Sequence, residues 1–299
     1  MFTFSVNAKE KPATRRGILS VASALYDPLG LVAPVSLIPK LMLQDFCRAG
    51  LDWDDKISDE QEAQWHDWLD SLHNLSNLSI DRCFKPEEFN EDAVVELHHF
   101  ADGSEKAYGA ASYLRIYDAN QVRCSLVIGK ARLAPIKTIS IPRLELSAAV
   151  VAVRLHKFIM EELDLKVNKT VFWSDSVSTI QYIRNRTKRF KTFIANRLAI
   201  IHDVTKPTDW KYVPSDLNPA DLASRGIQPN EPSKLHYWLK GPEFLNTTHH
   251  NYPEQPENLP SIDDSDCELK KSAYFISQNG LTEIINRHSS WTSLKMSFA

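Results

Sequence analysis

The stretch VVELHHFADGS (94–104) gives the clearest indication of the fold of this chain. Its apolar residues, followed by a Gly-Ser turn, predict a β-strand that ends at Asp102. A carboxylate beside an apolar core is energetically costly unless its charge is compensated. The stretch therefore predicts the first strand of a buried sheet, with an acid of functional interest at the end of that strand.

The segments that follow predict a mixed sheet. AYGAASYLRIY (107–117) and VRCSLVIGKARL (122–133) alternate like strands and are separated by a polar turn, DANQ. A long helix is expected over 142–163, because Pro142 stands where a helix start tolerates proline. The remaining elements are a strand at 168–175, helices at 176–186 and 190–204, a strand at 209–214 and a short helix at 219–226. This order predicts an α/β fold class, a mixed five-stranded sheet flanked by helices.

Composition divides the chain into five parts. Residues 17–80 look helical and apolar, and Trp65 and Trp68 stand at the spacing of a helix face that packs in a core. The chain after residue 228 is rich in Pro, Asn and acidic residues, which predicts a largely loose, partly disordered tail. The predicted parts are an N-terminal arm (1–16), a small helical region (17–80), a linker (81–92), the sheet domain (93–228) and a C-terminal extension (229–299).

Bulk composition argues against several classes of protein. Lys and Arg number 35 and Asp and Glu number 38, so a net charge of −3 gives no general argument for nucleic acid, and any such surface must be local. The four cysteines form no C-x-x-C pair, which argues against a zinc cluster or a disulfide framework. No signal-peptide core or membrane-spanning run stands out, so we expect an intracellular protein that is not secreted and has no membrane partner.

Three further acids stand, like Asp102, where one predicted element meets the next. Glu145 lies in the first turn of the long helix, Asp175 ends the strand FWSD, and Asp221 opens the last short helix. Each acid has an ordinary explanation as well: a turn for Asp102, the helix macrodipole for Glu145, and N-caps for Asp175 and Asp221. Together they favour a site for paired divalent metal ions, because hard cations such as magnesium prefer carboxylate oxygen. Such a pair bridges a scissile phosphate in phosphoryl-transfer enzymes.

The order of four motifs resembles a known family. FADGS, RLELSAA, FWSDS and NPADLASRG follow one another as in the type 1 ribonuclease H domains of retroelement reverse transcriptases. ILSVASALYDPLGLVAP, IPRLELSAA, RFKTFIANR and NPADLASRG look like the polyproteins of the Bel/Pao group of LTR retrotransposons. The resemblance extends from residue 14 to residue 245.

The resemblance implies a ribonuclease H-like fold and a catalytic site. In that family the acids matching Asp102, Glu145, Asp175 and Asp221 bind two Mg²⁺ ions, with Mn²⁺ as the alternative, and hydrolyse the RNA strand of an RNA–DNA hybrid. The resemblance also implies that residues 17–80 are a remnant of the reverse transcriptase thumb or connection. The polymerase part of such an enzyme is then a partner, and a cytoplasmic particle or the nucleus is the expected location.

Two features depart from the family pattern. Many ribonucleases H carry a histidine in a mobile loop before the last acid, but the loop here, VPSDLNPAD, has Asp216 and Asn218 and no histidine. This departure concerns turnover and not metal binding. No Tyr-x-Asp-Asp polymerase motif is present, so the chain is not expected to synthesise DNA by itself.

The densest basic run, RNRTKRFK, joins the two helices that follow Asp175. It is a candidate for gripping phosphates, although such runs are more often solvated loops. Recognition is expected to rest on backbone shape and on the RNA 2′-hydroxyl, with little base specificity. The predicted nucleic-acid-binding residues are Gly103, Ser104 and Ser176 beside the acids, and Arg184, Arg186, Lys188, Arg189 and Lys191 in the basic run.

Two other functions stay open. Bel/Pao polyproteins also contain an aspartic peptidase, in which two aspartates of Asp-Thr/Ser-Gly motifs share a proton. This chain has the order Asp102-Gly103-Ser104 instead, and the three other acids would go unused. The second alternative is a catalytically silent fragment that binds nucleic acid. The presence of all four acids argues against this alternative.

Overall fold

The computed structural model describes residues 1–4, 11–81, 83–84, 89, 92–248, 252–256 and 260–270. Most of the predicted linker at 81–92 lies outside the described residues, as do part of the arm at 1–16 and residues 271–299 of the extension. Among the described residues, no helix has the length and apolar character that a bilayer crossing requires.

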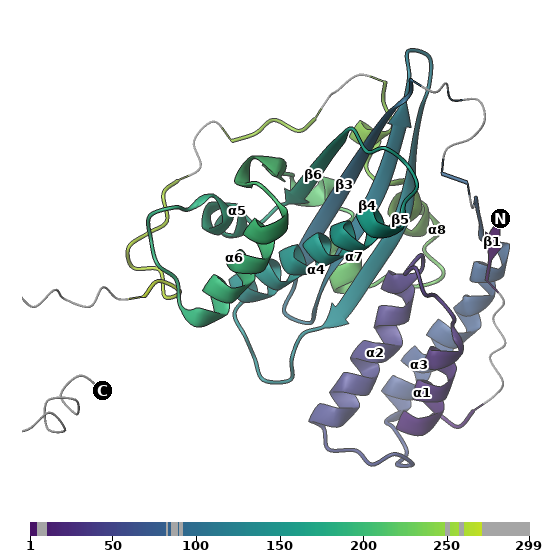
Figure 1. The fold of residues 1–299 in the computed structure, drawn as a ribbon. Helices are drawn as coiled ribbons and strands as arrows, with labels where there is room; N and C mark the ends of the chain where they lie inside the picture. Colours follow the sequence, from purple (N-terminus) through teal and green to yellow (C-terminus); the bar gives the residue numbers. More distant parts are fainter. Residues whose placement is uncertain are drawn as a thin grey trace, which may run out of the picture.

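A five-stranded mixed sheet forms the centre of the molecule (Figure 1). Its order is β5-β4-β3-β6-β7, where the central β3 pairs antiparallel with β4 and parallel with β6. The strands are β3 (Val94–Gly103), β4 (Ala107–Tyr117), β5 (Val122–Leu133), β6 (Lys169–Ser174) and β7 (Trp210–Tyr212). The predicted fold class, with this order of strands and helices, is confirmed.

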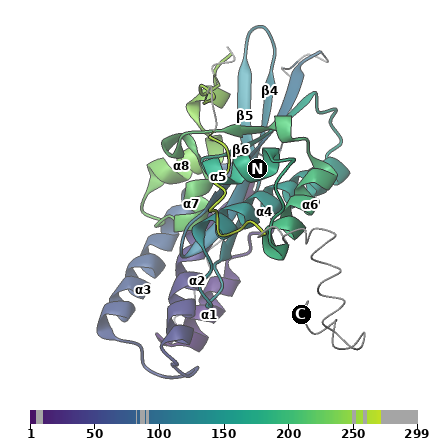
Figure 2. The same ribbon diagram turned by 90° about the vertical axis from the view of Figure 1, so that its left-hand side faces the viewer.

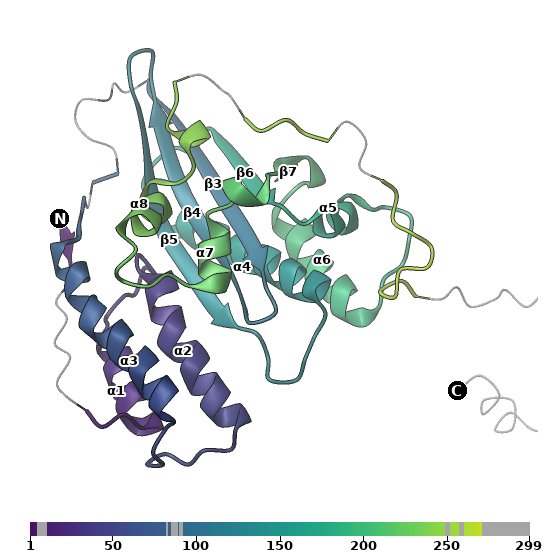
Figure 3. The same ribbon diagram turned by 180° about the vertical axis from the view of Figure 1, so that it is seen from behind.

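Helices cover both faces of the sheet (Figures 1 and 3). On one face lie α4 (Ile141–Glu162), α5 (Val177–Arg184) and α6 (Thr192–Val204), and on the other lie α7 (Ala220–Arg225) and α8 (Pro232–Lys240). Side chains of a strand alternate between the two faces. In β3, Leu97 and Ala101 therefore join the core under α4, whereas Phe100 joins the core that contains Trp238 of α8.

The N-terminal residues form a small group of helices at one end of the sheet (Figure 2). They are α1 (Arg15–Ala24), α2 (Ala33–Arg48) and α3 (Asp59–Ser71), followed by a 3₁₀ helix at Leu72–Asn77 and the short β1 and β2 (Phe2–Thr3 and Ser79–Ile80). Ser58 starts α3 with a capping box. The prediction that Trp65 and Trp68 pack in a core is confirmed, because both are buried and their rings stack 5.2 Å apart.

These helices pack directly on β5. Gly30 has a left-handed φ of +67° and lies so close to Gly129 that a Cβ there would stand 1.9 Å from the Gly129 carbonyl oxygen. The Gly129 amide donates to the Leu29 carbonyl at 2.9 Å, and the Trp238 indole donates to the Leu31 carbonyl, also at 2.9 Å. One apolar cluster therefore runs from α1–α3 across one face of the sheet to α8.

The start of the extension is also attached to the sheet. After α8 comes a 3₁₀ turn at Glu243–Leu245, and the fully buried guanidinium of Arg115 donates to the Leu245 carbonyl at 3.0 Å. Arg115 also forms an ion pair of 2.8 Å with the buried Glu96. A buried charge pair needs such hydrogen bonds to offset its desolvation.

Candidate active site

Asp102 lies at the end of the central strand, on the α7 side of the sheet. Its side chain is only 5% exposed and accepts a hydrogen bond from the Ser224 hydroxyl of α7. Gly109 is its cross-strand neighbour on β4. A Cβ on Gly109 would stand 2.7 Å from the Ala223 Cβ, so the absence of a side chain there lets α7 lie close enough for this contact.

Glu145 reaches the same point from the opposite face. The next residue of β3, Gly103, points towards α4, where a Cβ would stand 2.6 Å from the Glu145 amide nitrogen. Only glycine permits this approach, and it places the first turns of α4 against the strand end. Glu145 is 9% exposed there.

Asp175 follows β6, and the parallel register of Ala101 with Ser174 sets it beside Asp102. The amide of Asn218 donates to the Asp175 carboxylate and to the Ala101 carbonyl, each at 3.1 Å. Asn218 therefore ties the loop before α7 to both strand ends.

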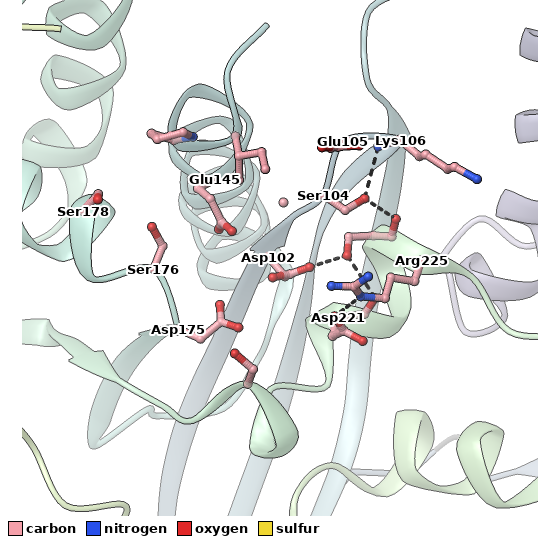
Figure 4. A pocket seen from close by; sticks show the side chains of 15 residues that line it. Asp102, Ser104, Glu105, Lys106, Glu145, Asp175, Ser176, Ser178, Asp221 and Arg225 are labelled. Carbon is pink, nitrogen blue, oxygen red and sulfur yellow. Dashed lines mark hydrogen bonds and ion pairs between the residues drawn. The ribbon is translucent and has the colours of Figure 1, made fainter. Parts of the chain in front are cut away.

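These three acids form one cluster. One carboxylate oxygen from each of Asp102, Glu145 and Asp175 lies within 4.8 Å of the other two, and Figure 4 shows the carboxylates facing a common space. Among the described residues, the buried Oε2 of Glu145 has no hydrogen-bond partner. An orphaned buried oxygen is costly unless a ligand satisfies it.

The electrostatics of the cluster favour the binding of a cation. Burial, followed by repulsion from Asp102 and Asp175, raises the pKa of Glu145 to about 9. Burial and the charge of Asp175 raise the pKa of Asp102 to about 7. Full ionisation of Asp102 and Glu145 is therefore unfavourable at neutral pH without a cation, and the donor set of the cluster suits a hard divalent ion.

Asp221, the fourth predicted acid, lines the same pocket but lies outside the cluster of three. Its carboxylate pairs with Arg225 one turn along α7, as Figure 4 shows. The sequence predicted four converging acids, and the structure brings three together and holds the fourth beside them.

The pocket around the cluster has a volume of about 770 Å³. Gly103, Ser104 and Ser176, predicted to bind nucleic acid, line it together with Lys106 and Arg225. The Ser104 hydroxyl also donates to the Ser224 carbonyl at 2.9 Å, and Ser176 caps α5 by accepting from the Thr179 amide at 3.2 Å.

The predicted basic run lies outside the acidic pocket, and part of it lines a different groove. Arg184 donates to the Trp210 carbonyl at 2.9 Å, and Lys188 pairs with Asp264 of the C-terminal extension at 2.8 Å. Arg186, Arg189 and Lys191 are exposed. Arg189 and Lys191 line a groove with residues 264–270 that shares no residue with the acidic pocket.

Sequence reasoning missed three residues that orient or contact the acids: Asn218, Ser224 and Arg225. All three belong to NPADLASRG, the motif in which the sequence analysis identifies only the acid as a site residue. The position of Arg225, four residues after Asp221 on one helix, was a signal for their ion pair. Asn218 and Ser224 contact Asp175 and Asp102, which are far away in the sequence, so no local pattern indicated them.

The order of the strands, the helices on both faces and the acids at the strand ends define a ribonuclease H-like domain. The family described as the Pao retrotransposon-like RNaseH-like domain matches residues 14–176. The chain therefore belongs to this family, and the resemblance noted from its motifs is confirmed.

Solved structures with a similar arrangement include several ribonucleases H. The N-terminal RNase H domain of Rv2228c from Mycobacterium tuberculosis is 12% identical, with 48% of this chain and 96% of that chain covered and a TM-score of 0.33. LC11-RNase H1 in complex with an RNA/DNA hybrid is 12% identical, with 42% and 91% covered and a TM-score of 0.30. The foamy viral protease-reverse transcriptase in complex with dsDNA is 13% identical, with 71% and 42% covered and a TM-score of 0.21. A search of curated proteins found no significant match.

Proposed function

We propose that this protein is a ribonuclease H that hydrolyses the RNA strand of RNA–DNA hybrids with the help of two divalent metal ions, magnesium in the first place. The observation that carries the proposal is the cluster of Asp102, Glu145 and Asp175, with its unsatisfied Glu145 oxygen. Membership of the Pao family supports the same reaction class.

Asp102, Glu145 and Asp175 would hold the ions, and Asp221 would join them once its carboxylate leaves Arg225. When bound, a metal pair lowers the pKa of water and stabilises negative charge on the leaving oxygen. In the proposed hydrolysis, the water oxygen bonds to phosphorus while the bond from phosphorus to the 3′ oxygen breaks, which leaves a 5′-phosphate and a 3′-hydroxyl.

Neighbouring residues have supporting roles in this proposal. Ser224 and Asn218 fix the orientation of Asp102 and Asp175 through the hydrogen bonds described above. Ser104, Ser176 and Lys106 line the pocket, where hydroxyls and a cation suit sugar and phosphate oxygens. The polymerase part of a reverse transcriptase is the proposed protein partner.

The direct test is cleavage of a labelled RNA–DNA duplex by the purified protein with and without Mg²⁺. We expect cleavage of the RNA strand only, with none of a DNA–DNA duplex of the same sequence and none in EDTA. Binding without cleavage at every Mg²⁺ and Mn²⁺ concentration would support the catalytically silent alternative. Cleavage of a protein substrate that pepstatin-type inhibitors block would support the peptidase.

Enlarging Gly103 should disturb the site without removing any acid. In Gly103→Ala the new methyl forces the start of α4 away from β3 and displaces Glu145. A misplacement of about 1 Å at a reacting centre costs about a hundredfold in rate. We expect a loss of that order in the initial rate of hybrid cleavage.

Gly50→Ala is the matched control for this variant, because a Cβ there meets nothing within 4 Å. Its left-handed φ of +73° makes alanine strained by about 1–2 kcal/mol, so stability should fall while the rate stays unchanged. Wild-type cleavage by Gly103→Ala would show that the contact with α4 does not position Glu145.

Without metal, the acidic cluster should make stability depend on pH. Asp102 and Glu145 have folded pKa values of about 7 and about 9, above their ordinary values near 4. Their contribution to stability is therefore complete below about pH 4 and is lost as the pH rises through 7 to 9. We expect the free energy of unfolding in EDTA to fall by several kcal/mol between pH 5 and pH 9, because each unit by which a folded pKa exceeds its ordinary value is worth about 1.4 kcal/mol.

Urea unfolding at several pH values measures this effect. Added Mg²⁺ should restore stability, and by more at pH 9 than at pH 5. Glu145→Gln should flatten the pH dependence in EDTA. If the free energy of unfolding without metal stays constant or rises between pH 5 and pH 9, the raised pKa values of Asp102 and Glu145 are wrong.

A further inference from the structure

The C-terminal segment 260–270, here called the acidic strap, lies across the basic run predicted to bind nucleic acid. Figure 3 shows it in yellow beside α5. Asp263, Asp264, Asp266 and Glu268 make it acidic, and Lys270 is its single cation. The strap therefore has the charge that complements the surface beneath it.

Backbone hydrogen bonds fix the strap alongside the run as a short antiparallel pair. The Lys191 amide donates to the Glu268 carbonyl at 2.8 Å, and the Lys270 amide donates to the Arg189 carbonyl at 2.9 Å. Ile262 is 8% exposed and packs in the core under α5 and α6. Few apolar side chains hold the strap, so its attachment is mainly polar.

Acidic side chains of the strap accept hydrogen bonds and ion pairs from donor groups on the surface beneath it. The contacts are Lys188 with Asp264 at 2.8 Å, the Tyr182 hydroxyl with Asp266 at 2.7 Å, and Arg143 with Glu268 at 2.7 and 2.9 Å. The contact of Arg143 with Glu268 is bidentate, and the Glu268 side chain is only 4% exposed. Arginine binds a phosphate with the same two-pronged geometry, so the Arg143 guanidinium that Glu268 occupies is chemically suited to a phosphate group.

The strap contacts a residue close to the acidic pocket. Arg143 lies in the first turn of α4, two residues before Glu145, and its neighbour Pro142 lines that pocket. Arg189 and Lys191 remain exposed in a groove of about 1100 Å³ between the basic run and the strap. These cations can attract a phosphate backbone before the strap leaves.

We propose that the acidic strap is an autoinhibitory contact that occupies the phosphate-binding surface formed by Arg143 and the basic run, and that an RNA–DNA hybrid must displace it. The proposal rests on the proposed function for the nature of the ligand. It concerns binding, so it can be tested separately from cleavage.

The first test compares hybrid affinity in the full chain after the strap is neutralised. The variant combines Asp263→Asn, Asp264→Asn, Asp266→Asn and Glu268→Gln, and Kd is measured by fluorescence anisotropy in EDTA over a range of salt. We expect about tenfold tighter binding or more, a normal size for coupling between two sites. The slope of log Kd against log salt should steepen by about 2, since Arg143 and Lys188 then meet phosphates as unpaired cations.

A matched control makes the same change of net charge elsewhere, with Glu60→Gln, Asp67→Asn, Glu161→Gln and Glu162→Gln, all of which are exposed. It should gain much less affinity, and an equal gain would reduce the effect to net charge and overturn the proposal. The single variant Asp264→Asn is a second test in case the fourfold variant does not fold. It should fold normally, because the Asp264 side chain is 96% exposed. It should still bind the hybrid more tightly than the wild type.

Hydrogen exchange follows the displacement itself. Hybrid should speed exchange of the amides in 260–270 of the wild type, while it protects the basic run. If the strap amides stay protected from exchange or become more protected, and the variants bind hybrid no more tightly, the strap only stabilises the fold. That result would overturn the proposal. Failure to bind hybrid at all would overturn it together with the proposed function, whereas binding and displacement without cleavage in Mg²⁺ would remove only the nuclease activity.

Discussion

Replacing Asp102 by asparagine is expected to abolish cleavage of RNA–DNA hybrids while leaving the fold intact. Asparagine has the same shape and can still accept the hydrogen bond from Ser224. It removes one negative charge from the cluster that Asp102 forms with Glu145 and Asp175. Metal ions contribute several kcal/mol to such reactions, and about 1.4 kcal/mol corresponds to a factor of ten, so a loss of about a thousandfold or more is expected.

Three measurements separate this loss from unfolding. Initial cleavage rates should fall to background, while the thermal midpoint in EDTA should stay equal to that of the wild type or rise, because a buried charge has been removed. The rise in midpoint on adding Mg²⁺ should shrink as well, since a ligand stabilises only the fold that binds it. Asp203→Asn, an exposed aspartate of α6, is the matched control and should behave as the wild type. Cleavage near the wild-type rate in Asp102→Asn would remove this acid from the site.

The largest expected loss of stability follows from replacing Trp238 by alanine. The indole is fully buried, packs on Gly129 of β5 and donates to the Leu31 carbonyl of the N-terminal helical region. Its removal leaves a large cavity where three distant segments meet, and Trp→Ala changes in cores cost about 3–5 kcal/mol. The Leu31 carbonyl also loses its donor, which adds about 1 kcal/mol or more.

Urea unfolding followed by far-UV circular dichroism measures this loss, with Trp53→Ala as the control. Trp53 is 45% exposed and its ring stacks with the Arg15 guanidinium, so its replacement should cost about 1 kcal/mol or less. Trp238 does not line the acidic pocket, and cleavage at low temperature should persist in both variants. A loss below about 1 kcal/mol in Trp238→Ala would show that α8 and the helical region are not coupled through this residue.

Much of the fold follows from local sequence patterns. Alternation in 107–117 and 122–133, the long periodic helix beginning near Pro142, and Gly226 after the last short helix each predict an element that the structure contains. These signals act within one element, because strand alternation and helix periodicity are properties of neighbouring residues. The acids were visible for the same reason, since each stands at the end of such an element.

The contacts between elements could not be predicted in this way. Gly103 is predicted to touch nucleic acid, but its role in letting α4 approach β3 depends on packing that no local pattern shows. Ser224 and Asn218 were not recognised as partners of Asp102 and Asp175, because more than 40 residues separate each pair in the chain.

The sequence by itself determined the kinds of elements, their order and the positions of four acids, because these depend on residues close together in the chain. Only the tertiary structure decided that three of those acids share one space, that Asp221 pairs with Arg225, and that the basic run lies under residues 260–270. The partner of a charge is set by distance in space, and spatial distance between remote residues is fixed only when the elements pack.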